Sequence, residues 1–345
     1  MIFRQRKYFI SCLTNEAESM NHRINKIPLL ILILFALLFS ACRKDIDELS
    51  FQSALPDTIW HNTITSGMPI SNLKSVLYPG SETDTFSINP GTVSTYNAAG
   101  GLTVKIIPGM LSNNGQQTTG LVTIESRLLL SKGDLIRADK PTVSNGRVLV
   151  SGGVMNIRLY QNGSLLTVSP SMPLMLEYPG NPLDQSMGLF YGDSSVASTF
   201  NWLPAQDSLS NPVQIFGLNY RIYTSQLGWI NCDKFYDTSN IPQSKIALEL
   251  PSNYTNANSA AFVVFKNKRT VIELYGDAGT MQFRSGNLPA GEEITVVVIS
   301  MQGNDYFYGQ TDAVISPQAT GSFMSVSLTP TISSLNAIED HLSAL

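Results

Sequence analysis

From about residue 84 onward, the chain alternates short apolar and polar runs and separates them with glycine, proline and asparagine. Leu102–Ile107 alternates along its whole length and stops at Pro108, and Leu121–Glu125 shows the same pattern. Such alternation places the apolar side chains on one face of a strand, and short strands at regular spacing are typical of a β-sandwich. We therefore predict an all-β fold.

Two Asn-Gly pairs indicate tight turns within this pattern. Asn145-Gly146 separates two apolar runs, and Asn162-Gly163 follows the alternating segment Met155–Tyr160. Asn-Gly favours two-residue hairpin loops because both central residues take a positive φ there. The sequence therefore predicts a hairpin at each pair.

The strand-like segments form two sets, separated by the polar stretch Thr199–Pro212. We expect a first β-sandwich domain over residues 84–205 and a second over residues 206–330, a division that suits the length of the chain. The second set begins near Val213 and includes the runs Arg221–Thr224, Lys245–Leu250, Ala261–Phe265, Thr270–Tyr275, Glu293–Ile299 and Ser322–Leu328.

The final segment, residues 331–345, has a helical rather than a strand-like period. Its apolar residues Leu335, Ile338, Leu342 and Leu345 fall on one face of a helix, and Ser333 or Ser334 is placed to cap it. We expect a short amphipathic helix that docks on one of the domains, and binding of a partner through the same face is the alternative.

The N-terminal region combines an apolar segment with a cysteine. Residues 27–41 are apolar but too short to span a membrane, and they end in Ser40-Ala41 before Cys42. This arrangement resembles the lipobox of bacterial lipoproteins. The resemblance implies a signal peptide over residues 1–41, cleaved so that Cys42 carries lipid, with Met20 as an alternative start of translation.

Residues 42–83 have little periodicity, so we expect a lipidated Cys42 followed by a flexible tether. The charged run over residues 43–48 is similar to the tether of lipoproteins exported to the surface of some Gram-negative bacteria. This likeness implies a protein held in the outer membrane through the lipid on Cys42. It leaves open whether the chain faces the surface or the periplasm.

Charge and cysteine content narrow the set of partners. Residues 1–41 hold five of the 22 basic and two of the 26 acidic residues, so the mature chain has 17 basic and 24 acidic residues and a net charge of −7. A mildly acidic chain without a basic block is a poor partner for nucleic acid. After cleavage only Cys42 and Cys232 remain, so a disulfide framework is not expected.

Histidine, which catalytic triads and zinc sites commonly need, is scarce in this sequence. The mature chain has two histidines, His61 in the tether and His341 in the terminal helix, so neither a Ser-His-Asp triad nor a His/Cys zinc site is expected. We predict no cofactor and no resident metal. Carboxylate pairs for glycoside hydrolysis stay open, with these candidates: Asp134, Asp139, Glu177 and Asp193.

Aromatic residues supply the candidates for ligand binding. Trp229 lies in a segment rich in Trp, Cys and Phe, and Tyr306 and Tyr308 lie in the run Asn304–Gly309. Exposed, these rings would stack on a glycan. Packed inside, they would belong to the core, where we also expect Cys232.

A second resemblance concerns residues 90–330. Gly101–Pro108, a strand that ends in Ile-Pro, and then Gly120–Ile124 are similar to the tandem β-domains of ankyrins and netrin receptors. The His-Phe-Ser triplet at which some of those relatives cleave themselves is missing from this sequence. The resemblance implies an interaction scaffold. Our prediction is therefore a lipid-anchored cell-envelope protein with a non-catalytic binding or structural role, as a scaffold for protein–protein interactions. A glycan-binding accessory lipoprotein and a carboxylate-based hydrolase are the alternatives.

Overall fold

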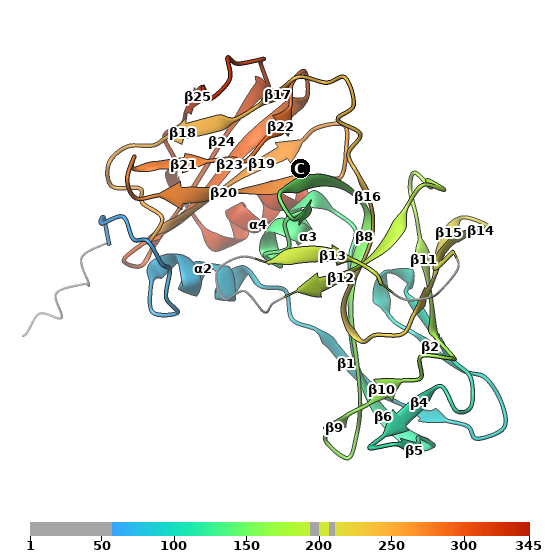
Figure 1. Cartoon of the computed structure of the whole chain (residues 1–345). Helices are drawn as coiled ribbons and strands as arrows, with labels where there is room; N and C mark the ends of the chain where they lie inside the picture. The colour runs from blue at the N-terminus through green and yellow to red at the C-terminus, as the bar shows by residue number, and fades with distance from the viewer. Residues whose placement is uncertain (1–56, 194–199, 207–210) are drawn as a thin grey trace, which may run out of the picture. The chain divides into compact units, whose positions relative to one another are not determined.

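The computed structural model describes residues 57–193, 200–206 and 211–345 of the chain. Within these ranges the protein consists mainly of strands, with three α-helices (Figure 1). The predicted all-β fold with a short C-terminal helix is confirmed. Cys42 and the predicted signal peptide lie outside the described residues. None of the helices in the described ranges is long and apolar enough to cross a bilayer.

The strands between residues 82 and 235 build a two-sheet sandwich. One sheet has the order β1-β6-β8-β16-β12-β13 and the other the order β14-β15-β11-β3-β2. Apolar side chains from both sheets share one core, among them Ile124 and Ile157 from the first and Leu176 from the second. The strands of the first sheet are β1 (Glu82–Ile88), β6 (Gly120–Leu129), β8 (Arg147–Gln161), β12 (Gly188–Asp193), β13 (Asn201–Pro204) and β16 (Gly228–Phe235). Those of the second are β2 (Ser94–Asn97), β3 (Thr103–Ile106), β11 (Leu174–Pro179), β14 (Val213–Phe216) and β15 (Asn219–Thr224).

Short strands and turns complete this sandwich. The strands β7 (Val143–Ser144) and β9 (Ser164–Leu165) pair with the two ends of β8. The turns that join them are the two predicted Asn-Gly hairpins, and all four turn residues have a positive φ. A three-stranded sheet contains β4 (Leu111–Asn113), β5 (Gln116–Gln117) and β10 (Thr167–Val168), and the 3-10 turn η1 (Ala99–Gly101) precedes β3.

The strands after residue 243 form a second, curled sheet of eight strands around its own core. Its order is β25-β18-β21-β20-β19-β23-β24-β26, and the central strands β19 and β23 are almost entirely buried. The bounds are β18 (Ile246–Glu249), β19 (Ser259–Phe265), β20 (Val271–Asp277), β21 (Gln282–Arg284), β23 (Glu293–Gln302), β24 (Asp305–Val314), β25 (Met324–Ser327) and β26 (Thr331–Ser333), with the separate pair β17 (Gln243–Ser244) and β22 (Leu288–Pro289).

The boundary between the two sets of paired strands falls after Phe235, not at residue 205. Strand β16, which the sequence analysis placed in the second domain, pairs with β8 along its length and completes the first sheet. The polar stretch that begins at Thr199 therefore does not separate two domains, because it contains β13 of the first sheet. A shared apolar cluster, with Trp202 on one side and Phe262 on the other, joins the two sets of strands, so the chain from Ser53 onward forms one compact unit.

A helix lies within the stretch expected to be a tether. The helix α2 (Pro69–Leu77) begins with proline at its first turn, and it buries Ile70, Leu73 and Leu77 in the shared cluster. Proline is well suited to that position because its missing N–H would be unpaired there anyway. The spacing of the three apolar residues gives α2 one apolar face.

The two remaining helices pack on each other. The helix α3 (Lys132–Arg137) begins with a capping box made by Ser131 and Asp134, and α4 (Leu335–Ser343) is capped by Ser334. Ile338 and Leu342 of α4 are buried in the shared cluster, so the terminal helix docks as expected.

Candidate functional site

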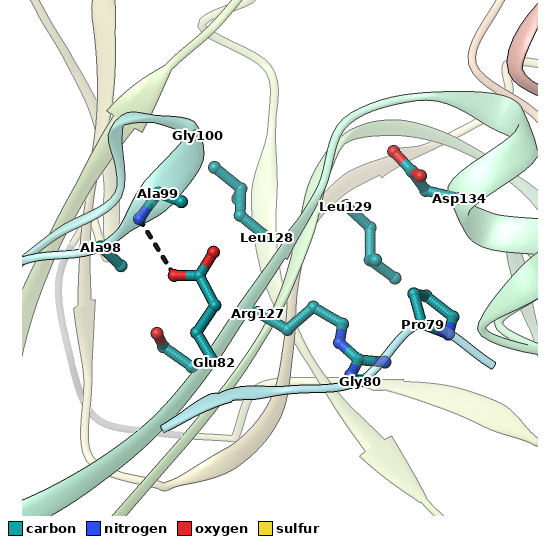
Figure 2. A pocket seen from close by; sticks show the side chains of 11 residues that line it. Pro79, Gly80, Glu82, Ala98, Ala99, Gly100, Arg127, Leu128, Leu129 and Asp134 are labelled. Atoms are coloured by element: carbon teal, nitrogen blue, oxygen red, sulfur yellow. Dashed lines mark hydrogen bonds between the residues drawn. The ribbon is translucent and has the colours of Figure 1, made fainter. Parts of the chain in front are cut away.

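A pocket lies where strand β1 leaves strand β6. The pairing of these strands begins at Glu82 opposite Ser126, while β6 runs on to Leu129. The connection from α2 crosses the edge of β6 here, and the space beside it is a cavity of about 210 Å³ (Figure 2). Its lining includes Gly80, Glu82, Ala99, Arg127, Leu129 and Asp134.

Arg127 is the central polar residue of this pocket. Its side chain is only 7% exposed, and its guanidinium carbon lies 4.4 Å from the centre of the Tyr78 ring. Nη2 donates a long hydrogen bond of 3.4 Å to the Ser81 hydroxyl, whereas Nε and Nη1 have no hydrogen-bond partner in the described residues. Burial lowers the pKa of Arg127 from its ordinary value, but a guanidinium stays protonated in proteins. Arg127 is therefore a buried cation with unused donors.

The carboxylates around the pocket have partners of their own. One oxygen of Glu82 accepts the backbone N–H of Ala99 at 3.1 Å. Asp134 caps α3 and forms an ion pair with Arg137. No ion pair within the described ranges includes Arg127. The pocket thus offers an unpaired cation beside a carboxylate that still has accepting capacity.

A second, more open cavity of about 370 Å³ is lined by amide side chains. They come from the β4–β5 hairpin and from the turn after β8, and they are Asn113, Asn114, Gln116, Gln117, Gln161 and Asn162. The Oδ1 atom of Asn113 is buried without a hydrogen-bond partner in the described residues. Amides donate and accept hydrogen bonds without carrying charge, so this amide cleft suits a neutral polar ligand.

The three predicted ligand-binding aromatics pack against the shared apolar cluster, and none of them lines the pocket. Tyr308 is buried and stacks on His341 of α4 with 4.5 Å between ring centres. Tyr306 is half-buried beside it. Trp229 is half-buried under the ammonium group of Lys140, which lies 4.8 Å from the centre of its ring.

Cys232 is the one cysteine among the described residues. Cys232 is buried in the sandwich core, as expected, and burial raises its pKa to about 12. Its thiol therefore stays protonated at neutral pH and is a poor nucleophile. The lipidation site proposed from the sequence, Cys42, lies outside the described residues.

The candidate carboxylates for hydrolysis come from separate elements. Asp134 belongs to the cap of α3, and Asp139 accepts a hydrogen bond from Lys74. Glu177 on β11 is paired with Lys105 and Arg221, and it is buried with its pKa lowered because these two cations outweigh the effect of burial. Asp193 ends β12. In the part of the chain that the structure describes, no group of three or more His, Cys, Asp or Glu side chains is arranged to hold a metal ion.

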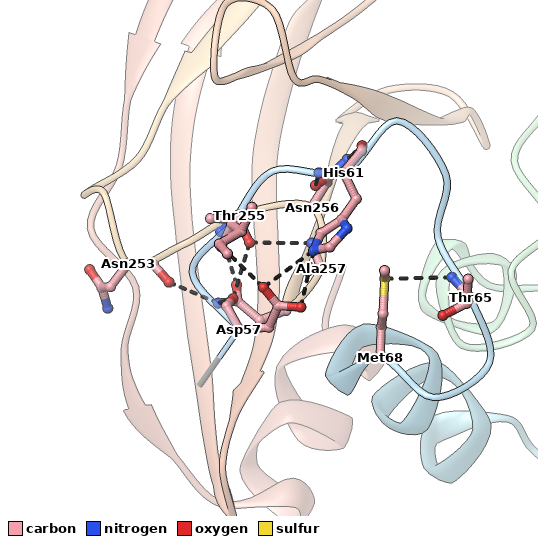
Figure 3. A network of polar contacts seen from close by, with 10 residues as sticks. Asp57, His61, Thr65, Met68, Asn253, Thr255, Asn256 and Ala257 are labelled. Atoms are coloured by element: carbon pink, nitrogen blue, oxygen red, sulfur yellow. Dashed lines mark hydrogen bonds and ion pairs between the residues drawn. The ribbon is translucent and has the colours of Figure 1, made fainter. Parts of the chain in front are cut away.

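A polar network holds the start of the described chain (Figure 3). The side-chain amide of Asn256 exchanges two hydrogen bonds with the backbone of His61, at 2.9 Å and 2.6 Å. The carbonyl of Asp57 accepts from Asn258 at 2.7 Å and from Thr255 at 3.2 Å. The segment that would follow a tether is thus clamped onto a loop of the second sheet.

A scan against family models and a search of curated proteins found no match for this sequence.

Proposed function

We propose that this protein is a lipid-anchored cell-envelope protein with a non-catalytic binding role, and that the Arg127 pocket is its ligand site. The observation that supports the proposal is the pair of unpartnered guanidinium nitrogens beside a cavity. A buried donor without an acceptor costs free energy, about 1–3 kcal/mol for an uncharged group and more for a charged one. A ligand that supplies the acceptor recovers that cost, so the pocket is suited to binding.

The proposed anchor rests on the lipobox at Cys42. Fourteen residues separate Cys42 from Asp57, where the clamp on the second sheet begins. Fully extended, such a segment reaches at most about 50 Å. A protein held in this way in the outer membrane would offer its pocket to soluble or surface-bound ligands close to the membrane, which fits an interaction scaffold.

Filling the pocket tests the binding role. Gly80 lines the pocket and a Cβ atom built on it meets nothing within 4 Å, so Gly80→Leu adds a bulky side chain at the rim of the pocket. Gly91 is equally open but does not line the pocket, which makes Gly91→Leu a matched control. We expect an NMR screen of sugars, sugar acids and short peptides to find a ligand of the chain from Ser53 onward that Gly80→Leu weakens at least about tenfold. Ligands that all bind Gly80→Leu as well as wild type would contradict the proposal.

Cell fractionation tests the anchor separately. Wild-type protein should be found in the outer membrane and incorporate labelled fatty acid. Cys42→Ser should abolish the labelling and leave the precursor unprocessed. Labelling that persists in Cys42→Ser would refute the assignment of the lipid to this residue.

The amide cleft favours a second candidate function, that of a glycan-binding accessory lipoprotein. Its six amides match the hydroxyl groups of a neutral sugar, each of which donates and accepts. Gln117→Ala, at an exposed position of the cleft, should then weaken the binding of a neutral oligosaccharide on a glycan array. Gln214→Ala, outside the cleft, is the control, and equal binding by both variants would remove this candidate.

A further inference from the structure

We infer that the outer face of the sheet β14-β15-β11-β3-β2 binds an acidic oligosaccharide through Arg221. This inference goes beyond the proposed function, because none of these five strands lines the Arg127 pocket. It follows from the way in which Arg221 is held, from the charge of this outer face and from the polar side chains that surround the arginine.

Two contacts hold Arg221 in place. Its Nε donates to Oε1 of Glu177 on the neighbouring strand β11 at 2.6 Å. Its guanidinium carbon lies 3.6 Å from the centre of the Phe216 ring, so the ring covers one face of the guanidinium. Glu177 is itself fixed, because its other oxygen accepts from Lys105 at 2.8 Å. The arginine is thus oriented before a ligand arrives, which lowers the entropy that binding costs.

The two terminal nitrogens of Arg221 are available to a ligand. Nη1 and Nη2 donate to no partner within the described ranges and, unlike Nε and Nη1 of Arg127, they are not enclosed. They form the outer edge of the guanidinium, from which two parallel N–H groups can point to the two oxygens of one carboxylate. Because Glu177 already occupies Nε, this outer edge is the one that a ligand carboxylate can use.

The charge of the outer face also favours a carboxylate. Lys105, Glu177 and Arg221 are the charged residues of the five strands, and together they carry one net positive charge. The whole chain has a formal net charge of −4, so this face is an exception within an acidic protein. A ligand with single negative charges is therefore attracted here more than to the remaining surface.

The surroundings of Arg221 suit a sugar. Alternation turns most apolar residues of the five strands inward and leaves these hydroxyl and amide side chains on the outer face: Thr95, Asn97, Thr103, Gln214 and Asn219. Such groups donate and accept hydrogen bonds, as sugar hydroxyls do. Phe216 is 55% exposed, and its ring offers an apolar surface to the C–H groups of a sugar.

The same face is too polar for a typical protein interface. Phe216 is the only large apolar side chain of the five strands that is exposed, whereas the centre of a protein interface is mostly apolar. At the usual spacing between strands the face is about 19 Å wide, which gives room for several sugar units. An oligosaccharide is therefore the occupant that this face favours over a protein.

Calorimetry with a matched pair of trisaccharides tests the inference. Trigalacturonate and its methyl ester have the same rings, but the ester carries no charge. We expect the chain from Ser53 onward to bind the acid at least about fivefold more tightly than the ester. Arg221→Lys keeps the charge but loses the planar pair of donors, and it should weaken binding of the acid at least about fivefold.

A second variant leaves Arg221 and its supporting contacts in place. Gln214 is exposed and lies opposite Arg221 in the pairing of β14 with β15, so Gln214→Glu adds a carboxylate that competes for the terminal nitrogens. It should weaken binding of trigalacturonate at least about threefold. Gln243→Glu adds the same charge at an exposed position of β17, outside this face, and should leave the affinity unchanged.

Each outcome either supports or overturns the inference. Equal binding of acid and ester, no binding of the acid at millimolar concentration, or binding that neither variant weakens overturns it. If Arg221→Lys lowers the unfolding temperature by more than a few degrees, Gln214→Glu decides alone. Hexaglutamate that binds as tightly as trigalacturonate, and is weakened by Gln214→Glu, would overturn the choice of a glycan. None of these results bears on the proposed function, which Gly80→Leu tests at the Arg127 pocket.

Discussion

Lys74 joins three segments of the chain, and its removal gives a sharp test of how the two sets of strands are held together. Its ammonium group on α2 donates to Asp139 after α3 at 2.8 Å and to Glu273 on β20 at 2.7 Å. Burial by itself would lower the pKa of Lys74, but the two carboxylates raise it well above its ordinary value. We predict that Lys74→Met destabilises the protein, because it leaves two carboxylates facing each other without their shared cation.

The magnitude follows from the exposure of these side chains. Removal of one partner from a fully buried ion pair costs about 3–5 kcal/mol, whereas an exposed pair contributes about 0–1 kcal/mol. Here the three side chains are 26–39% exposed, which places the junction between the two cases. We therefore expect a loss of about 2–3 kcal/mol. Methionine keeps most of the aliphatic contacts of the lysine, so the loss reflects mainly the charge.

Urea unfolding measures this loss as a lower midpoint at an unchanged slope. The double variant Lys74→Met, Glu273→Gln should recover part of the lost stability, because it removes one of the two facing charges. The effect should be constant between about pH 6 and pH 9. A lysine whose pKa is raised in the folded state contributes its full stabilisation at every pH below the pKa of the unfolded state, and this stabilisation is lost only as the pH rises above that value. A loss below about 0.5 kcal/mol, or a double variant less stable than Lys74→Met, would refute the reasoning.

Three further predictions concern other parts of the fold. Burial raises the pKa of Asp233 to about 8, so stability should fall as pH rises from about 4 to about 8, by at most about 1.4 kcal/mol per unit, and Asp233→Asn should flatten this dependence in urea titrations. A Cβ atom on Gly133 would collide with the carbonyl oxygen of Leu342, so Gly133→Ala should separate α3 from α4 and lower the urea midpoint by the equivalent of about 1–3 kcal/mol. Asn256→Ala removes both hydrogen bonds to the His61 backbone, so proteolysis within residues 57–64 should accelerate several-fold, and an unchanged rate would contradict the clamp.

Local patterns along the chain predict those elements of the fold whose signal is local. The hairpins at Asn145 and Asn162 follow from the backbone requirement of a two-residue turn, which a sequence states directly. The terminal helix follows from the spacing of Ile338 and Leu342, because a helical face is a local property. Long-range partners are not local, and β16 shows the difference: its position along the chain assigns it to the second domain, whereas it pairs with β8 of the first sheet.

The helix α2 shows a second limit of sequence analysis. Its three buried residues have the spacing of a helical face, but the flanking prolines and polar residues make the region look irregular. A helix this short is marginal in isolation, and most of its stability comes from packing. In this protein that packing is supplied by residues more than fifty positions further along the chain, among them Leu135 and Phe262.

Arg127 escapes sequence analysis because its strand makes it look exposed. In β6 the residues Val122, Ile124 and Ser126 are buried while Thr123 and Glu125 between them are not, so alternation assigns position 127 to the outer face. The outer face of β6 is open to solvent along the part that pairs with β1. Beyond the start of β1, the connection from α2 folds over Arg127. A strand can extend past the end of its neighbouring strand. A charged residue on the outer face of that extension is therefore a better indicator of such a pocket than an aromatic cluster. Aromatic rings gain more from the core than from solvent, which is where Tyr308 lies.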